Sequence, residues 1–330
     1  MRHNVLLSAV LVWFSLADLS QAGHRYVVKI MEVARAFRIF LIGFVLVLSA
    51  CVTVEPRSPD QLRIGLEPTM KVRTPTGDGP FPTVVILHGA NDPTWRTGYS
   101  DWMDWLVARG YAAVFIDSAA ARGVSADAMM GPGLMPSERA ADVFIALDIL
   151  RKKPFVDKSR FALIGMSHGG DTALDALVQA PPAGPVKGLT AVPPLGLSGL
   201  KAVAAFYPGC RKPVMGVRVT EVYDRAWTQN IPVVIFQGSN DTYVDIPLCQ
   251  AVVKRQEAKG TPIQYYFYKG EPHCFDADYG DGPDCYRSSA PAADARTKVE
   301  RLLSQVFQYR RDIRTHGPNW VRWRTPHSVY

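Results

Sequence analysis

The sequence predicts an α/β protein built on a mostly parallel, doubly wound sheet that is flanked by helices. Apolar runs with strand character alternate with helix-like segments, an order typical of such a sheet. The runs are apolar without interruption, as in strands that are covered on both faces. The expected strands are Thr83–Leu87, Ala112–Ile116, Phe161–Ile164, Ala202–Phe206, Pro232–Phe236 and Ile263–Tyr268.

Helices are expected in the segments between these strands. The segment that opens at Ser137 places its apolar residues on one face, as a helix packed on a sheet does. Residues 118–135 and 181–200 are expected to be long loops, which tend to carry function or to cover a site. The expected helices are 99–109, 137–152, 170–179, 246–259 and 293–308.

The chain of 330 residues has the length of one α/β domain with terminal extensions. We expect a targeting segment in residues 1–50 and a polar, proline-bearing tether in 51–60. The folded domain is expected in 61–309. A basic, aromatic tail without periodicity follows in 310–330.

The net charge of +7 is confined to the two ends of the chain. Residues 1–50 carry five Lys/Arg against two Asp/Glu, and residues 310–330 carry five Arg against one Asp. The body between them is neutral, with 27 residues of each sign. Because a nucleic-acid surface needs clustered Lys and Arg, the body is not expected to bind nucleic acid.

An apolar run at 39–48 has the features of an export signal. It is shorter than the roughly 20 residues of a membrane-spanning helix. It follows Arg35 and Arg38, and small residues come after it. Leu48-Ser49-Ala50-Cys51 resembles the lipobox of bacterial lipoproteins, in which the cysteine is lipidated. This resemblance implies an exported protein, periplasmic or at the outer membrane, that is anchored to a membrane through Cys51.

Met31 lies 20 residues before Cys51, a typical distance for such a signal. We therefore interpret Met31 as the true start and residues 1–30 as a mis-assigned extension. Two other interpretations stay open. Residues 5–16 could belong to an uncleaved anchor, or Cys51 could follow a signal anchor by chance.

Four further cysteines, an even number, suggest two disulfides in an exported protein. Three pairings are possible. We favour Cys274 with Cys285, which would close a short loop after His273, and Cys210 with Cys249, which both follow expected strand ends. Four free thiols are the alternative. A metal site is not expected, because no CxxC pair occurs.

The sequence Gly165-Met166-Ser167-His168-Gly169 lies between an expected strand and an expected helix. G-x-S-x-G in this context predicts a sharp turn that exposes a nucleophilic serine at the edge of a sheet. Side chains two positions before and after the serine would collide in such a turn, so glycine is needed there. Ser167 is the predicted nucleophile.

A serine hydroxyl needs a base, and the base needs an orienting acid. In hydrolases with this turn, the chain order is serine, acid, histidine. Residues 51–309 contain only His88, His168 and His273. His88 precedes the serine, and His168 follows it directly, so that its side chain should point away from the hydroxyl. His273, just after the last expected strand, is the predicted base.

The acid should follow a strand between Ser167 and His273. Asp241 lies in the tight turn after the expected strand that ends at Phe236, whereas Asp245 is placed to cap the next helix. We assign the orienting role to Asp241. It would hold the tautomer of His273 and stabilise the imidazolium.

An oxyanion hole needs backbone N–H groups from two loops. The residue after the nucleophile, His168, supplies one. The loop His88-Gly89-Ala90-Asn91 follows an apolar strand and supplies the other. Ala90 is our first choice in this loop and Asn91 the second.

Together these segments resemble the dienelactone hydrolase-like branch of the α/β-hydrolases. The resemblance implies an α/β-hydrolase fold without a large cap domain, hydrolysis of ester-like bonds, and triad positions at Ser167, Asp241 and His273. One departure is that the founding members use a cysteine nucleophile, which favours a general ester hydrolase over a lactone-specific enzyme. The matching pieces are VVILHG at 84–89, AVFIDS at 113–118, ERAADVFIALDIL at 138–150, GMSHGG at 165–170, AAFYPGC at 204–210, FQGSND at 236–241 and YKGEPHCFD at 268–276.

Three functions are compatible with these residues. The first is a serine hydrolase of carboxylic-ester or lactone bonds that acts on a small molecule without a cofactor or metal ion. The second is an exported peptidase or depolymerase of the same fold. The third is a non-catalytic binding protein of that fold, against which the intact set of serine, aspartate and histidine argues.

Overall fold

The computed structural model describes residues 55–308, with gaps at 91–96, 126–127, 130–132, 182–184, 211–226, 228, 277, 279–284 and 286. Within these residues the centre is a seven-stranded sheet in the order β1-β3-β2-β4-β5-β6-β7. β1 is antiparallel to β3, and the other neighbouring strands are parallel, which confirms the expected sheet. The strands are β1 (Lys71–Arg73), β2 (Phe81–Leu87), β3 (Ala112–Ile116), β4 (Val156–Met166), β5 (Leu200–Phe206), β6 (Val233–Gly238) and β7 (Ile263–Tyr268).

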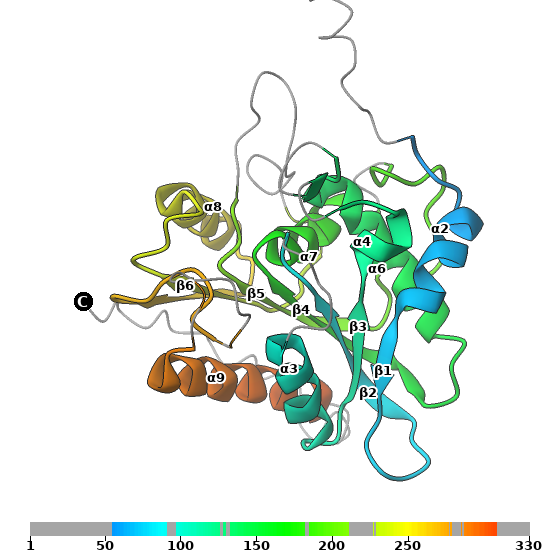
Figure 1. Ribbon diagram of the computed structural model, residues 1–330, viewed down its shortest axis with the longest axis horizontal. Helices are drawn as coiled ribbons and strands as arrows, with labels where there is room; N and C mark the ends of the chain where they lie inside the picture. Colours follow the sequence, from blue (N-terminus) through cyan, green and yellow to red (C-terminus); the bar gives the residue numbers. More distant parts are fainter. Residues whose placement is uncertain are drawn as a thin grey trace, which may run out of the picture. The chain divides into compact units, whose positions relative to one another are not determined.

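Helices cover both faces of the sheet (Figure 1), with α3 and α9 on one face and α2, α4, α6, α7 and α8 on the other. All five expected helices are present. Among the described residues they are accompanied by two that were not expected, α2 and α4, and by a short 3₁₀ helix, η1 (Glu67–Thr69). The helices are α2 (Pro59–Leu66), α3 (Thr97–Val107), α4 (Ser118–Arg122), α6 (Pro136–Leu150), α7 (His168–Gln179), α8 (Ile246–Ala258) and α9 (Ser289–Gln308).

The inner strands carry apolar residues on both faces because each face of the sheet has its own core. Successive strand residues point to opposite faces. Val85 and Leu87 of β2 pack in the core with α6 and α7, whereas Val84 and Ile86 pack in the core with α3 and α9. The inner strands are therefore buried on both faces, whereas the edge strands β1 and β7 are partly exposed.

The prediction of a loop over 118–135 is wrong at its start, where α4 forms. The carboxylate of Asp117 accepts a hydrogen bond from the Ala120 N–H at 2.9 Å and so caps the helix. Gly123 ends it in the left-handed conformation, with φ of 65°. The run of three alanines between these signals has high helix propensity.

α2 begins inside the segment that was expected to be a tether. Ser58 and Gln61 form a capping box, and Pro59 occupies the first helical position. Just before the helix, Arg57 pairs with Leu189 in an isolated parallel bridge, which joins this segment to the described part of the loop 181–200.

Both favoured disulfide pairings are confirmed. Cys210–Cys249 joins the loop after β5 to α8, and Cys274–Cys285 closes a loop after β7. Among the described residues, no helix combines the length and the apolar character needed to cross a membrane. The apolar run 39–48 and Cys51 lie outside the described residues.

Candidate active site

Ser167 stands at the junction of β4 and α7 in a backbone conformation that few residues adopt, with φ of 51° and ψ of −118°. The two flanking glycines make this turn possible. A Cβ on Gly165 would collide with the carbonyl oxygen of Gly169, and a Cβ on Gly169 would collide with that of Leu87. The backbone N–H of Ser167 donates to the Phe206 carbonyl at 2.9 Å, which ties the turn to β5.

The parallel register brings the candidate residues to one edge of the sheet. Leu87 of β2 is level with Gly165 of β4, and Phe206 of β5 is level with Phe236 of β6. The loops that follow these strands therefore open on the same side, where ligands bind in sheets of this class.

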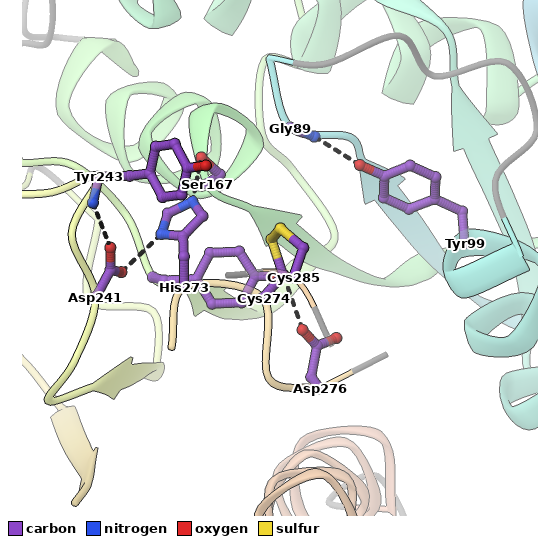
Figure 2. The surroundings of a disulfide bond; sticks show 10 residues. Gly89, Tyr99, Ser167, Asp241, Tyr243, His273, Cys274, Asp276 and Cys285 are labelled. Atoms are coloured by element: carbon purple, nitrogen blue, oxygen red, sulfur yellow. Dashed lines mark hydrogen bonds and ion pairs between the residues drawn. A yellow bond between two sulfur atoms is a disulfide. The ribbon is translucent and has the colours of Figure 1, made fainter. Parts of the chain in front are cut away.

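The imidazole of His273 lies between Ser167 and Asp241 (Figure 2). Its Nε2 is 2.9 Å from Oγ of Ser167, and its Nδ1 is 2.6 Å from Oδ2 of Asp241. Because an ionised carboxylate only accepts hydrogen bonds, Nδ1 carries the proton and Nε2 accepts from the hydroxyl. The structure thus brings together the three residues that the sequence predicted.

The carboxylate of Asp241 is held by two further donors. Oδ2 accepts from the side-chain amide of Gln237 at 2.7 Å, and Oδ1 accepts from the backbone N–H of Tyr243 at 2.9 Å. Asp245, the competing candidate, instead caps α8 by accepting from the Leu248 N–H. The geometry therefore favours Asp241 over Asp245.

The sequence did not indicate the aromatic residues that surround His273. The ring of Tyr207 lies 4.5 Å from the imidazole, centroid to centroid, and the ring of Tyr243 lies 5.1 Å from it. Tyr207 is buried, whereas half of the Tyr243 surface is exposed. Tyr243 is thus the member of this pair that an incoming substrate can contact.

The loop that carries His273 is braced by a buried carboxylate. Asp276 accepts from the indole N–H of Trp102 at 2.7 Å and from the hydroxyl of Tyr207 at 2.8 Å. The Cys274–Cys285 disulfide lies beside it in the same loop (Figure 2). These contacts link α3, the loop after β5 and the histidine loop.

The loop after β2 approaches the site from the other side. Gly89 donates its N–H to the hydroxyl of Tyr99 at 2.9 Å (Figure 2), and its carbonyl accepts from Nδ1 of His88 at 2.6 Å. Ala90 comes next, and Asn91 lies outside the described residues. The side chain of His168 points away from the triad, as expected, and contacts the Leu134 carbonyl and Arg139.

Three comparisons with known proteins place this site among relatives. A model of the dienelactone hydrolase family matches residues 70–308. The chain is 34% identical over 101 residues to acylamino-acid-releasing enzyme 1 of Oryza sativa subsp. japonica, which covers 30% of this chain and 13% of that protein. It is 28% identical over 212 residues to dipeptidyl aminopeptidase BIII of Pseudoxanthomonas mexicana, a match that covers 60% of this chain and 31% of that protein. The chain thus spans under a third of the length of these curated relatives.

Solved structures share the fold at low sequence identity. Esterase 2 of Thermogutta terrifontis, phosphorylated by paraoxon, aligns with a TM-score of 0.56 at 16% identity, over 72% of this chain and 88% of that one. A structure described as a putative dienelactone hydrolase from Klebsiella pneumoniae subsp. pneumoniae aligns with a TM-score of 0.54 at 16% identity, over 72% and 99%. The match to the family model covers most of the chain and all seven strands, so this protein belongs to the dienelactone hydrolase family.

Proposed function

We propose that the protein is a serine hydrolase that cleaves carboxylic-ester or lactone bonds through an acyl-enzyme on Ser167. The observation that carries this proposal is the continuous hydrogen-bond chain from the Ser167 hydroxyl through His273 to Asp241. Membership of a hydrolase family supports the same class of reaction.

In the proposed reaction, Oγ of Ser167 attacks the ester carbonyl while Nε2 of His273 takes the hydroxyl proton. Asp241 holds the tautomer and stabilises the imidazolium. The backbone N–H groups of His168 and Ala90 receive the oxyanion. The imidazolium then protonates the leaving alcohol, and a water molecule, activated by the same histidine, releases the acid and regenerates the serine.

Hydrolysis of amide bonds is the second candidate. It is favoured by the relatives named as a dipeptidyl aminopeptidase and as acylamino-acid-releasing enzymes. An anilide has a poorer leaving group than an ester with the same acyl group. Turnover of matched p-nitrophenyl esters and p-nitroanilides therefore separates the two candidates, and esters of increasing acyl length define the preferred substrate.

A fluorophosphonate probe tests the nucleophile directly. We expect labelling of the wild type and none of Ser167→Ala, with the same thermal stability. Absence of labelling in folded wild type would support the third function, a non-catalytic binding protein. Retention of labelling in Ser167→Ala would assign the nucleophile to another residue.

We also propose that the enzyme works outside the cytoplasm, anchored through Cys51. The two disulfides support an oxidising compartment, where such bonds persist. The intact mass of the protein isolated from membranes tests the anchor, because lipidation removes residues 1–50 and adds acyl chains. A detected peptide from residues 1–30 would contradict Met31 as the start.

A further inference from the structure

A buried arginine of α6 joins the two loops from which the oxyanion donors are expected. Arg139 has no exposed surface. It donates from Nη1 to the His88 carbonyl at 2.7 Å and to Nδ1 of His168 at 3.2 Å, and from Nε to Oγ of Ser118 at 2.8 Å. His88 follows β2, Ser118 opens α4, and His168 opens α7. One side chain thus connects three elements behind the nucleophile turn.

The partners of the two histidines fix their tautomers. Arginine has no acceptor, so Nδ1 of His168 accepts, and its Nε2–H donates to the Leu134 carbonyl at 2.9 Å. His88 has the opposite arrangement. Its Nδ1–H donates to the Gly89 carbonyl at 2.6 Å, and its Nε2 accepts from the Ser118 N–H at 3.2 Å. Both rings are neutral in this network, and each uses both of its nitrogens.

These contacts pin two successive peptide units of the loop after β2. In the first, the His88 carbonyl accepts from Arg139 and the Gly89 N–H donates to Tyr99. In the second, the Gly89 carbonyl accepts from His88, and in a trans peptide the Ala90 N–H then points the opposite way. Among the described residues, the Ala90 N–H is the one group of these two units without a partner.

The guanidinium of Arg139 also places a positive charge beside the loop after β2 and the first turn of α7. Burial lowers the pKa of Arg139 to about 10, so the side chain stays protonated at neutral pH. No described carboxylate lies within ion-pair distance of it. Arg122, by contrast, pairs with Asp142 at 2.7 Å. The carboxylates of Asp142 and Asp117 act on Arg139 through longer-range electrostatics and offset part of its charge. A buried cation stabilises negative charge that develops nearby.

We propose that Arg139 is a positioning residue of the oxyanion hole. Together with His88 and His168 it holds the Ala90 N–H and the first turn of α7 in the arrangement that receives the oxyanion. This inference rests on the proposed hydrolase function, and it assigns a role to three residues outside the Ser167–His273–Asp241 set.

Replacement of Arg139 by methionine tests the role, with Arg151→Met as the matched control. Arg151 is also buried and donates to two backbone carbonyls, those of Gly196 and Ser198, which precede β5 at the opposite edge of the sheet. On p-nitrophenyl acetate we expect Arg139→Met to lose about 10²-fold in kcat with KM nearly unchanged, because the oxyanion forms only after binding. Arg151→Met should keep kcat within about threefold of the wild type, because Arg151 donates no hydrogen bond to the described residues of the loops that carry the oxyanion donors.

The pH dependence of kcat/KM separates this loss from damage to the triad. His273 keeps its contacts in Arg139→Met, so the acidic limb of the profile should keep the wild-type midpoint.

A second pair of variants, at His88, tests the loop after β2. His88→Asn keeps an amide N–H where Nδ1 donates to Gly89, and His88→Leu removes it. We expect His88→Asn to retain about tenfold more kcat than His88→Leu, which loses the hydrogen bond that orients the Gly89–Ala90 peptide.

Nitrogen-15 NMR of the histidine rings provides a readout that needs no substrate. It should report an Nδ1–H tautomer for His88 and an Nε2–H tautomer for His168, and the His168 signals should change in Arg139→Met. The proposal is overturned if Arg139→Met, folded, behaves like Arg151→Met, or if either tautomer is reversed. If wild type neither labels with fluorophosphonate nor turns over esters, the hydrolase function itself fails, and the positioning role fails with it.

Discussion

The hydroxyl of Tyr207 donates a hydrogen bond of 2.8 Å to the carboxylate of Asp276, three residues beyond His273. Tyr207 also places its ring against the imidazole of His273 and has a φ of 40°, a conformation that non-glycine residues rarely adopt. The loop after β5 and the loop after β7 are therefore held as one unit around the proposed base.

Substitution of Asp276 should loosen this unit. Asp276→Ala leaves the buried donors of Trp102 and Tyr207 without their acceptor, so we expect a loss of about 2–4 kcal/mol in the free energy of unfolding. Tyr207→Phe removes one hydrogen bond and should cost only about 1 kcal/mol. Urea unfolding of both variants provides the measurement. Equal losses in the two would contradict a carboxylate that is shared between two donors.

Asp241→Asn should abolish most of the activity without unfolding the protein. The amide would favour the wrong tautomer of His273, and such a change lowers kcat by about 10⁴-fold in a related triad. Asp245→Asn is the matched control, because asparagine caps helices as well as aspartate does. It should retain nearly full kcat on the same ester. If Asp245→Asn is the more damaging variant, the acid has been assigned wrongly.

The glycines of the nucleophile turn should differ in their tolerance of alanine. Gly169→Ala drives a Cβ into the Leu87 carbonyl, so we expect little folded protein or a loss of more than about 3 kcal/mol. A Cβ at Gly170 meets the carbonyl oxygens of Phe206 at 3.1 Å and Gly165 at 3.3 Å, contacts that need shifts of only a few tenths of an ångström. Gly170→Ala should fold with a milder loss. Thermal unfolding and soluble yield compare the two.

The stability of the enzyme should fall below neutral pH in part because of His88. Complete burial and the nearby charge of Arg139 hold the pKa of His88 well below its usual value. The unfolded chain therefore binds a proton at His88 below about pH 6.5 that the folded chain does not bind, and acid favours unfolding. Between pH 7.5 and 5.5, wild type should lose about 1.4 kcal/mol more than His88→Asn. Equal losses would place a proton on folded His88.

The two disulfides should contribute unequally to stability. Cys210–Cys249 spans 39 positions of sequence and Cys274–Cys285 spans 11. Because a longer loop loses more chain entropy in the unfolded state, paired Cys→Ala changes should cost about 4 kcal/mol for the first bond and about 3 for the second. The second pair should nevertheless affect kcat more, since Cys274 adjoins His273. Denaturant unfolding measures which disulfide contributes more to stability, and ester turnover measures which contributes more to kcat.

The sequence predicted the triad because each member lies at most five residues after the end of a strand that is easy to recognise. Chain order and the position after a strand were sufficient for Ser167, Asp241 and His273. Parallel register then brings these strand ends to one edge, whatever the helices do. The same logic predicted six of the seven described strands and five of the described helices. It missed β1, whose three residues, two of them basic, form no apolar run.

The supporting residues could not be predicted in this way. Arg139 lies in a helical segment where a charged side chain usually faces solvent, and its partner His88 is 51 positions away. Asp276 and Trp102 are separated by 174 positions. Nothing local distinguishes these residues from surface charges, because their role depends on which buried donors and acceptors the tertiary fold brings together. α2 could have been predicted, because its Ser58–Gln61 capping box is visible in the sequence. It was missed because the polar, proline-bearing composition of 51–60 favoured a tether.

The first strand of the sheet has a consequence for how copies of this protein meet. β1 is an edge strand of three residues, two of which, Lys71 and Arg73, are basic. A strand this short offers few backbone groups to a second chain. Copies of this protein at high local concentration would therefore resist joining edge to edge through β1 into a continuous, aggregating sheet.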